Sequence, residues 1–173
     1  MTSSRTLALT CTLLALSAAA SAAPVAASND AKVDAMVKSL AAAPARTFGK
    51  AASFCAANHQ PAGQALDVRL TAYVSAMSSG TREALLEIAK TDPGFLQSTP
   101  AYSGKDFDMM DQQADAILQQ VQASPAEGCA KLGSTLEAGN SAFFKDYTLQ
   151  SHREYQAKRA QYCARSPKPA NCN

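Results

Sequence analysis

The stretch that decides the fold is residues 105–136, KDFDMMDQQADAILQQVQASPAEGCAKLGSTL. Its first part carries apolar side chains three and four residues apart, on one face of a helix: Phe107, Met110, Ala114, Ile117, Leu118 and Val121. Such spacing is typical of a helix that buries one side. The next residues have the types and spacing of a helix start. Ser124 suits the N-cap, Pro125 the first helical position, and Glu127 the capping-box partner of the N-cap. The stretch therefore predicts two consecutive helices.

Helical spacing also predominates on both sides of this stretch. Further helices are predicted at residues 29–44, ended by Pro44, at about 48–55, at 64–79, from Gly80 to the DPG at 92–94, and at 141–163. No segment alternates apolar and polar residues long enough to predict a strand. Residues 95–104, FLQSTPAYSG, have no clear period and are expected to form a loop. Residues 28–165 are thus predicted to form an all-α, disulfide-stapled helical bundle of four main helices plus shorter ones.

The first residues, MTSSRTLALTCTLLALSAAASAAP, have the layout of a secretory signal peptide. Arg5 precedes a short apolar stretch, and small residues at the sites of an A-x-A motif follow it. We therefore predict a signal peptide at residues 1–22, with cleavage between 22 and 28, and a periplasmic or extracellular location. The apolar stretch is shorter than the roughly 20 residues that a membrane-spanning helix needs. No later stretch is longer, so no membrane span is expected.

Removal of the leader discards Cys11 and leaves four cysteines in about 150 residues: Cys55, Cys129, Cys163 and Cys172. An even number of cysteines in an exported chain is typical of disulfides. Four cysteines allow three pairings. We favour Cys55 with Cys129, because both lie on apolar helix faces, and Cys163 with Cys172, because they are close in sequence. The second pair would close the proline-containing tail at residues 166–173.

The charge of the chain is nearly balanced, at +2 overall. This balance gives no support for binding nucleic acid. The residues from Ser124 onward are mildly basic, with seven Lys and Arg against four Asp and Glu. That asymmetry is too small to identify a partner by itself.

Motifs for catalysis or metal binding are missing from the sequence. It has no G-x-S-x-G, H-E-x-x-H, C-x-x-C or C-x-x-C-H. We therefore expect no enzyme, no cofactor and no metal site. The alternative is a small periplasmic enzyme or a bundle that binds a metal or haem.

Two features keep that alternative open. Asp108, Asp111 and Asp115 follow one flank of a helix, where carboxylates suit a hard cation, although the interpretation we favour is an acidic helix start that faces water. Met36 and His152 have the order in which exported four-helix b-type cytochromes hold haem, although Met36 shares a face with core residues.

Aromatic and basic side chains recur along residues 141–163. The candidate binding face consists of Lys145, Tyr147, His152, Arg153, Tyr155, Arg159 and Tyr162. Tyrosine suits both the edge of a core and a binding surface, so both roles stay open. If the face is a surface, it would suit an acidic partner. The function we expect is that of a non-catalytic binding module acting on another exported or envelope protein, as an inhibitor, an immunity-type partner or an envelope accessory factor.

Overall fold

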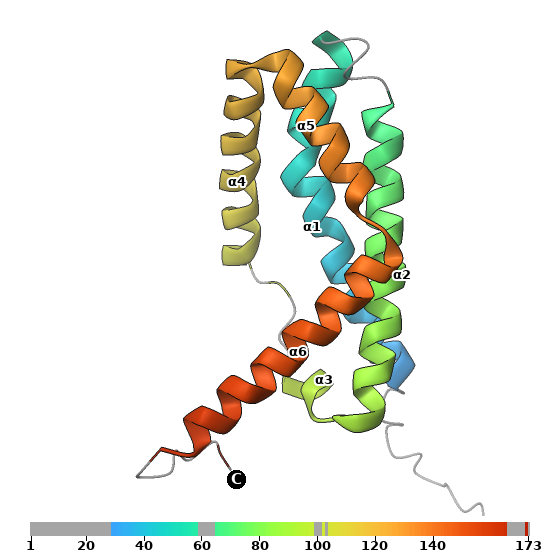
Figure 1. The fold of residues 1–173 in the computed structure, drawn as a ribbon, viewed down its shortest axis with the longest axis vertical. Helices are drawn as coiled ribbons and strands as arrows, with labels where there is room; N and C mark the ends of the chain where they lie inside the picture. The colour runs from blue at the N-terminus through green and yellow to red at the C-terminus, as the bar shows by residue number, and fades with distance from the viewer. Residues whose placement is uncertain (1–28, 59–64, 99–101, 103, 166–171, 173) are drawn as a thin grey trace, which may run out of the picture.

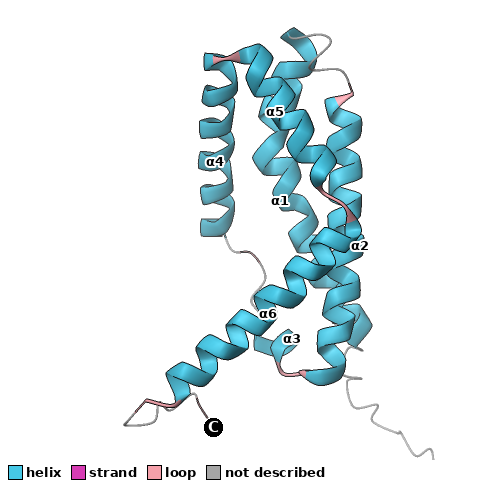
Figure 2. Ribbon diagram, in the orientation of Figure 1, coloured by secondary structure: helices cyan, strands magenta, loops and turns pink. Residues whose placement is uncertain are grey.

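The computed structural model describes residues 29–58, 65–98, 102, 104–165 and 172. Within these residues it contains six helices and no strand (Figures 1 and 2). They are α1 (Asn29–Asn58), α2 (Leu66–Thr91), α3 (Phe95–Ser98), α4 (Gly104–Ala123), α5 (Pro125–Ala138) and α6 (Ser141–Cys163). The predicted all-α fold is confirmed. The predicted leader and its cleavage region, and the tail apart from Cys172, lie outside the described residues.

The two longest helices, α1 and α2, pack along each other and form the centre of the molecule. At one end α4 and α5 pack against this pair (Figure 1). At the other end α6 crosses α2 and then runs away from the bundle (Figure 1). Among the described helices, none has both the length and the apolar character that crossing a membrane requires.

The prediction that Pro44 ends the first helix is wrong, because α1 continues through it to Asn58. An interior proline removes one backbone hydrogen bond and disfavours a helix by about 3 kcal/mol. Pro44 is buried, and α1 packs against both α2 and α4. Burial of apolar surface on both sides of the proline offsets that cost. The short helix predicted at residues 48–55 is therefore the second half of α1.

The predicted helix boundary at Gly80 is also wrong, because α2 passes through this residue without a break. Gly80 is buried where α6 crosses α2. A Cβ atom added at Gly80 would fall on the carbonyl oxygen of Ser141 and 2.9 Å from the backbone nitrogen of Lys145. The glycine permits a close approach between two helices rather than ending one of them.

The predicted loop at residues 95–104 is wrong in its first part, where Phe95–Ser98 form the short helix α3. The backbone N–H of Phe95 donates to the Asp92 carboxylate at 3.2 Å, which begins this turn. Leu96 is buried among side chains of α1 and α2. Tertiary contacts therefore fold a segment that has no helical period of its own.

The start predicted for α5 is correct in position, with Ser124 as N-cap and Pro125 as the first helical residue. The Ser124 side chain makes no capping hydrogen bond, so the predicted capping box is not formed. At the start of α6 the Asn140 side chain does cap the helix, accepting a hydrogen bond from the Phe143 N–H at 2.9 Å.

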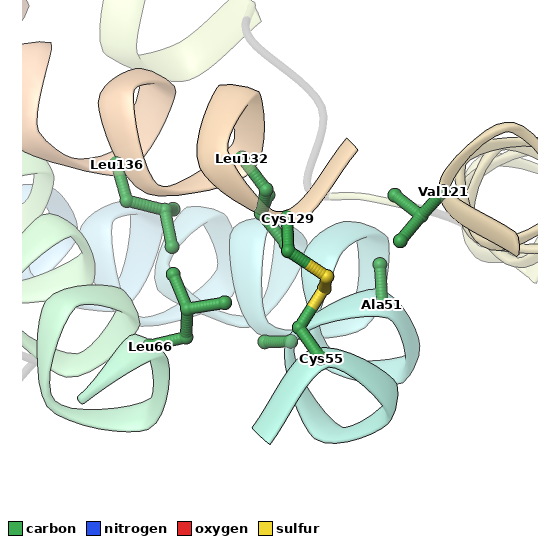
Figure 3. Close-up of a cluster of buried hydrophobic side chains, with 8 residues drawn as sticks. Ala51, Cys55, Leu66, Val121, Cys129, Leu132 and Leu136 are labelled. Carbon is green, nitrogen blue, oxygen red and sulfur yellow. A yellow bond between two sulfur atoms is a disulfide. The ribbon is translucent and has the colours of Figure 1, made fainter. Parts of the chain in front are cut away.

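Two clusters of buried side chains form the core. The first, here called the disulfide core, joins α1, α2, α4 and α5 (Figure 3) and consists of Ala51, Ala52, Cys55, Leu66, Val121, Cys129, Leu132 and Leu136. The second core joins α1, α2 and α3, with Leu149 of α6 packed against it, and consists of Val33, Leu85, Ile88, Ala89 and Leu96. Because α1 and α2 enter both clusters, they connect the two ends of the molecule.

Both predicted disulfides are confirmed. Cys55 of α1 bonds to Cys129 of α5, with an S–S distance of 2.03 Å, and both residues are fully buried in the disulfide core (Figure 3). Cys163, the last residue of α6, bonds to Cys172 and closes the end of the chain onto that helix. One bridge therefore crosses the core, and the other is local.

Candidate functional site

The C-terminal half of α6 extends beyond the helices that it packs against (Figure 1). From Arg153 to Arg165 every residue is exposed except Gln156 and Cys163, which are partly buried. Tyr155 and Tyr162 are 41% and 40% exposed. Helices of this length are marginally stable in water when nothing packs on them. This half-helix therefore presents a surface that the described chain does not cover.

The cations of this half-helix are not paired with carboxylates. Arg153, Lys158 and Arg159 make no ion pair with any described Asp or Glu side chain. The Arg165 guanidinium lies 5.4 Å from the centre of the Tyr162 ring, which is a cation–π contact. The positive charge of the segment is thus available to a partner.

Some of these cations surround a surface hollow of about 570 Å³, here called the basic hollow. It is lined by Gly94, Tyr155, Lys158, Arg159, Tyr162, Cys163 and Cys172. The Cys163–Cys172 bridge forms part of its wall and so fixes the end of α6 beside these side chains. The described lining combines aromatic surface with two cations and includes no Asp or Glu side chain.

Two residues of the predicted face, Lys145 and His152, instead hold α6 on the bundle. The Lys145 ammonium donates to the Glu83 carboxylate at 2.7 Å, and this hydrogen bond raises the pKa of Lys145 above its ordinary value. His152 Nε2 lies 3.1 Å from Asp92 Oδ2, and its ring meets the Phe95 ring edge-on at 4.7 Å. These contacts come from α2, from the turn that follows it and from α3, so neither residue is free to bind a partner.

An apolar groove of about 730 Å³ lies between α1, α2 and α6. We call it the aromatic groove, after the rings that line it: Tyr73, Phe95, Tyr102, Phe144, Tyr147 and Tyr155. Phe143 and His152 also line it, and Met36, Leu40, Met77 and Leu85 supply aliphatic surface. Tyr147, at the edge of the groove, is 63% exposed. Phe144, three residues earlier on α6, is buried.

The seven residues of the predicted face therefore do not form one site. Lys145 and His152 fasten α6 to α2, Tyr147 lines the aromatic groove, and Arg153 lies alone on the outer surface. Arg159 and Tyr162 line the basic hollow, and Tyr155 lines both sites. Sequence reasoning missed Phe95 and Tyr102, because both lie in the segment expected to be a loop. It missed Tyr73 as a site residue, because its spacing indicates only a core face.

Two aspartates of α4, Asp111 and Asp115, pair with cations of α1 at the exposed surface of the bundle. The Arg46 guanidinium donates to Asp111 at 2.6 and 3.0 Å, and Lys50 pairs with Asp115. The hydrogen bond from Arg46 lowers the pKa of Asp111 below its ordinary value. Among the described residues no three His, Cys, Asp or Glu side chains are grouped to hold a metal ion. The pairs connect α4 to α1, two helices that also pack against each other.

Met36 and His152, the pair considered for haem, both line the aromatic groove. The Nε2 atom of His152 lies 3.1 Å from Asp92 Oδ2 and 3.3 Å from Gln156 Nε2. A metal bond through this atom would require both contacts to break.

A comparison of the chain with protein-family models finds no match, and neither a curated protein nor a solved structure is found to be significantly similar to it.

Proposed function

We propose that the mature chain is an exported, non-catalytic protein that binds an acidic partner protein through the basic hollow and the outer face of α6. The observation that carries the proposal is the projecting half of α6, with exposed tyrosines and unpaired cations. Tyrosine and arginine are the residue types enriched at the energetic centres of protein interfaces. An acidic surface would supply carboxylates to Arg153, Lys158 and Arg159, which pair with no described Asp or Glu side chain.

Export is supported by the leader-like first residues and by the two disulfides, since disulfides persist in oxidising compartments. The location we propose is the periplasm or the extracellular medium. Another exported or envelope protein is then the expected partner, and the roles that fit are inhibitor, immunity-type partner or envelope accessory factor.

The stabilisation expected from such a contact has two parts. Burying the Tyr155 and Tyr162 rings removes apolar surface from water. The cations steer an acidic partner toward the face and increase the association rate, an effect that salt screens over about 8–10 Å. Binding should therefore weaken as ionic strength rises, without disappearing.

The test is affinity capture from the native envelope fraction with the mature, oxidised protein, repeated with Tyr155→Ala and Arg159→Glu. Lys131→Glu is the matched control, because Lys131 is an exposed lysine of α5 and makes no ion pair with a described carboxylate. Helical content of all variants is compared by circular dichroism. The captured protein is then produced separately, and its Kd is measured at two salt concentrations.

We expect one acidic protein to be captured by the wild type and by Lys131→Glu, and to be lost or strongly reduced with the two α6 variants. Loss of a hot-spot side chain weakens binding by about 2 kcal/mol or more, which is roughly thirtyfold in Kd. Equal capture by all four proteins would exclude this face as the binding site. Equal loss with Lys131→Glu would indicate a general charge effect.

A further inference from the structure

The aromatic groove is a concave surface that, apart from Tyr155, the proposed partner site leaves unused. Its two sides are α1 and α6, and no Cα atoms of these two helices lie within 8 Å of each other in the described part of the chain. Between them α2 contributes Tyr73, Met77 and Leu85. The groove thus contains side chains that contact the disulfide core, such as Tyr73, and side chains of the second core, such as Leu85.

The described residues that line the groove include no Asp, Glu, Lys or Arg side chain. The histidine among them, His152, is bound by Asp92. The polar groups that remain are hydroxyls, from tyrosines and from Thr81, Thr148 and Ser151. This contrasts with the basic hollow, where Lys158 and Arg159 line the wall.

Such a lining selects against charge. An anion that entered the groove would lose water without gaining a cationic partner, and burial of an unpaired charge is costly. Transfer of an uncharged ring out of water costs little free energy. Inside the groove the ring can stack on the tyrosine and phenylalanine rings or meet them edge-on. Small-molecule sites of proteins have this composition, and their volumes are about 300–1,000 Å³. The 730 Å³ of the groove lies within that range.

We propose that the aromatic groove binds an uncharged small molecule that contains an aromatic ring system. This site is separate from the proposed partner site, although Tyr155 lines both. The Ser151 hydroxyl on this lining can hydrogen-bond to a polar atom of the ligand, and the Thr148 hydroxyl, which donates to the Phe144 carbonyl oxygen at 2.8 Å, can accept a hydrogen bond from it. Occupancy would add contacts between α1 and α6 and hold α6 more firmly against the bundle.

The test compares two dyes with the same ring skeleton. N-phenyl-1-naphthylamine is uncharged, and 1-anilinonaphthalene-8-sulfonate is the same molecule with one sulfonate. Both become fluorescent when they leave water. Titration of the mature, oxidised protein should give one site for the uncharged dye and a Kd at least about tenfold weaker for the sulfonate, because the charge finds no partner.

The chain offers an independent signal, because it has no tryptophan and five tyrosines. Four of the five line the groove: Tyr73, Tyr102, Tyr147 and Tyr155. Tyrosine emission should therefore fall as the uncharged dye binds, with the same midpoint as the rise in dye emission.

Two tyrosines of α6 form a matched pair of variants. Tyr147→Ala removes an exposed ring from the groove, and Tyr162→Ala removes an exposed ring from the basic hollow. We expect Tyr147→Ala to raise the Kd of the uncharged dye by about three- to tenfold and Tyr162→Ala to leave that Kd unchanged. Ser151→Trp places a bulky ring at an exposed lining position and should block the dye. Because all three positions are exposed, none of these changes empties the core.

Several outcomes would overturn the proposal. They are equal binding of the two dyes, many weak sites per chain, or an unchanged Kd in both Tyr147→Ala and Ser151→Trp. Competition of the dye by the captured partner protein, but by no uncharged aromatic compound, would assign the groove to a segment of that partner. A Soret band in the purified protein would assign it to haem. Failure of the dye test leaves the partner proposal intact, since Arg159→Glu, at a residue that lines the basic hollow and not the groove, tests that site separately.

Discussion

Gly80 determines how closely α6 can approach α2. Its backbone lies against Ser141 and Lys145, in the first turns of α6. Lys145 then pairs with Glu83 and Glu87 of α2, at 2.7 and 3.6 Å. The crossing of α6 over α2 is therefore fixed both by Gly80, which has no side chain, and by the ion pair of Lys145 with Glu83, one turn away. Because the projecting half of α6 continues from this crossing, Gly80 also sets the direction of the candidate binding face.

We expect Gly80→Ala to destabilise the protein by about 1–3 kcal/mol, as overpacking typically does, because the added methyl group meets backbone atoms that cannot move aside. Gly49→Ala is the control. Gly49 also lies inside a helix, but an added Cβ would have no heavy atom within 4 Å. That variant should gain about 0.5–1 kcal/mol from reduced backbone entropy. Urea unfolding followed by circular dichroism measures both, and equal effects of the two changes would contradict the close approach.

At the scale of elements, the Cys55–Cys129 bridge joins the end of α1 to the start of α5. These helices share few other contacts compared with the α1–α2 pair, although both contribute side chains to the disulfide core. The bridge closes a loop with a sequence separation of 74 residues, against 9 for Cys163–Cys172. In the chain-entropy model the longer loop stabilises by about 4 kcal/mol and the shorter by about 2.5–3.

Replacing Cys55 and Cys129 together by serine should therefore cost more free energy of unfolding than replacing Cys163 and Cys172. The difference should exceed the entropic one, because both core cysteines are fully buried and serine would bring a hydroxyl group into apolar surroundings. The comparison uses denaturant unfolding, with the midpoint and slope measured for the two double variants and for the wild type. A larger loss from the terminal pair would mean that the end of α6 contributes more to the stability of the fold than its exposure indicates.

At the scale of the whole molecule, the fold consists of two cores connected by α1 and α2, with α6 fastened at its start and exposed at its end. The ion pairs of α4 with α1, and the contacts of Lys145 and His152 with α2 and the turn after it, connect these parts at the surface. Exposed pairs of this kind contribute little each. The long bridge and the apolar clusters therefore dominate the stability.

Export predicts a definite covalent form of this molecule. Intact-mass analysis of protein recovered from the periplasm or the medium should give a chain that begins after a residue between Ala22 and Ser28 and has no free thiol. Reduction before alkylation should then label four cysteines, because Cys11 is lost with the leader. A full-length species with free thiols inside the cell would contradict both the export and the oxidised state.

The sequence by itself determined the helical class and most helix termini, and it favoured the two cysteine pairings that the structure shows. These depend on local information: the three-and-four spacing of apolar residues, the Ser124–Pro125 start, and an even cysteine set of which two members are close in sequence. The basic and aromatic character of α6 was equally visible, because side-chain type is local too.

Only the tertiary structure decided which of these residues share a site. Pro44 and Gly80 were expected to end helices, but burial of α1 and the crossing of α6 over α2 outweigh local propensity at both positions. The aromatic groove brings together Met36, Tyr73, Phe95 and Tyr147 from four helices, and no spacing along the chain encodes that proximity. Helix formation depends on neighbours in sequence, whereas a groove depends on the directions in which packed helices diverge, and those follow from contacts between residues far apart in the chain.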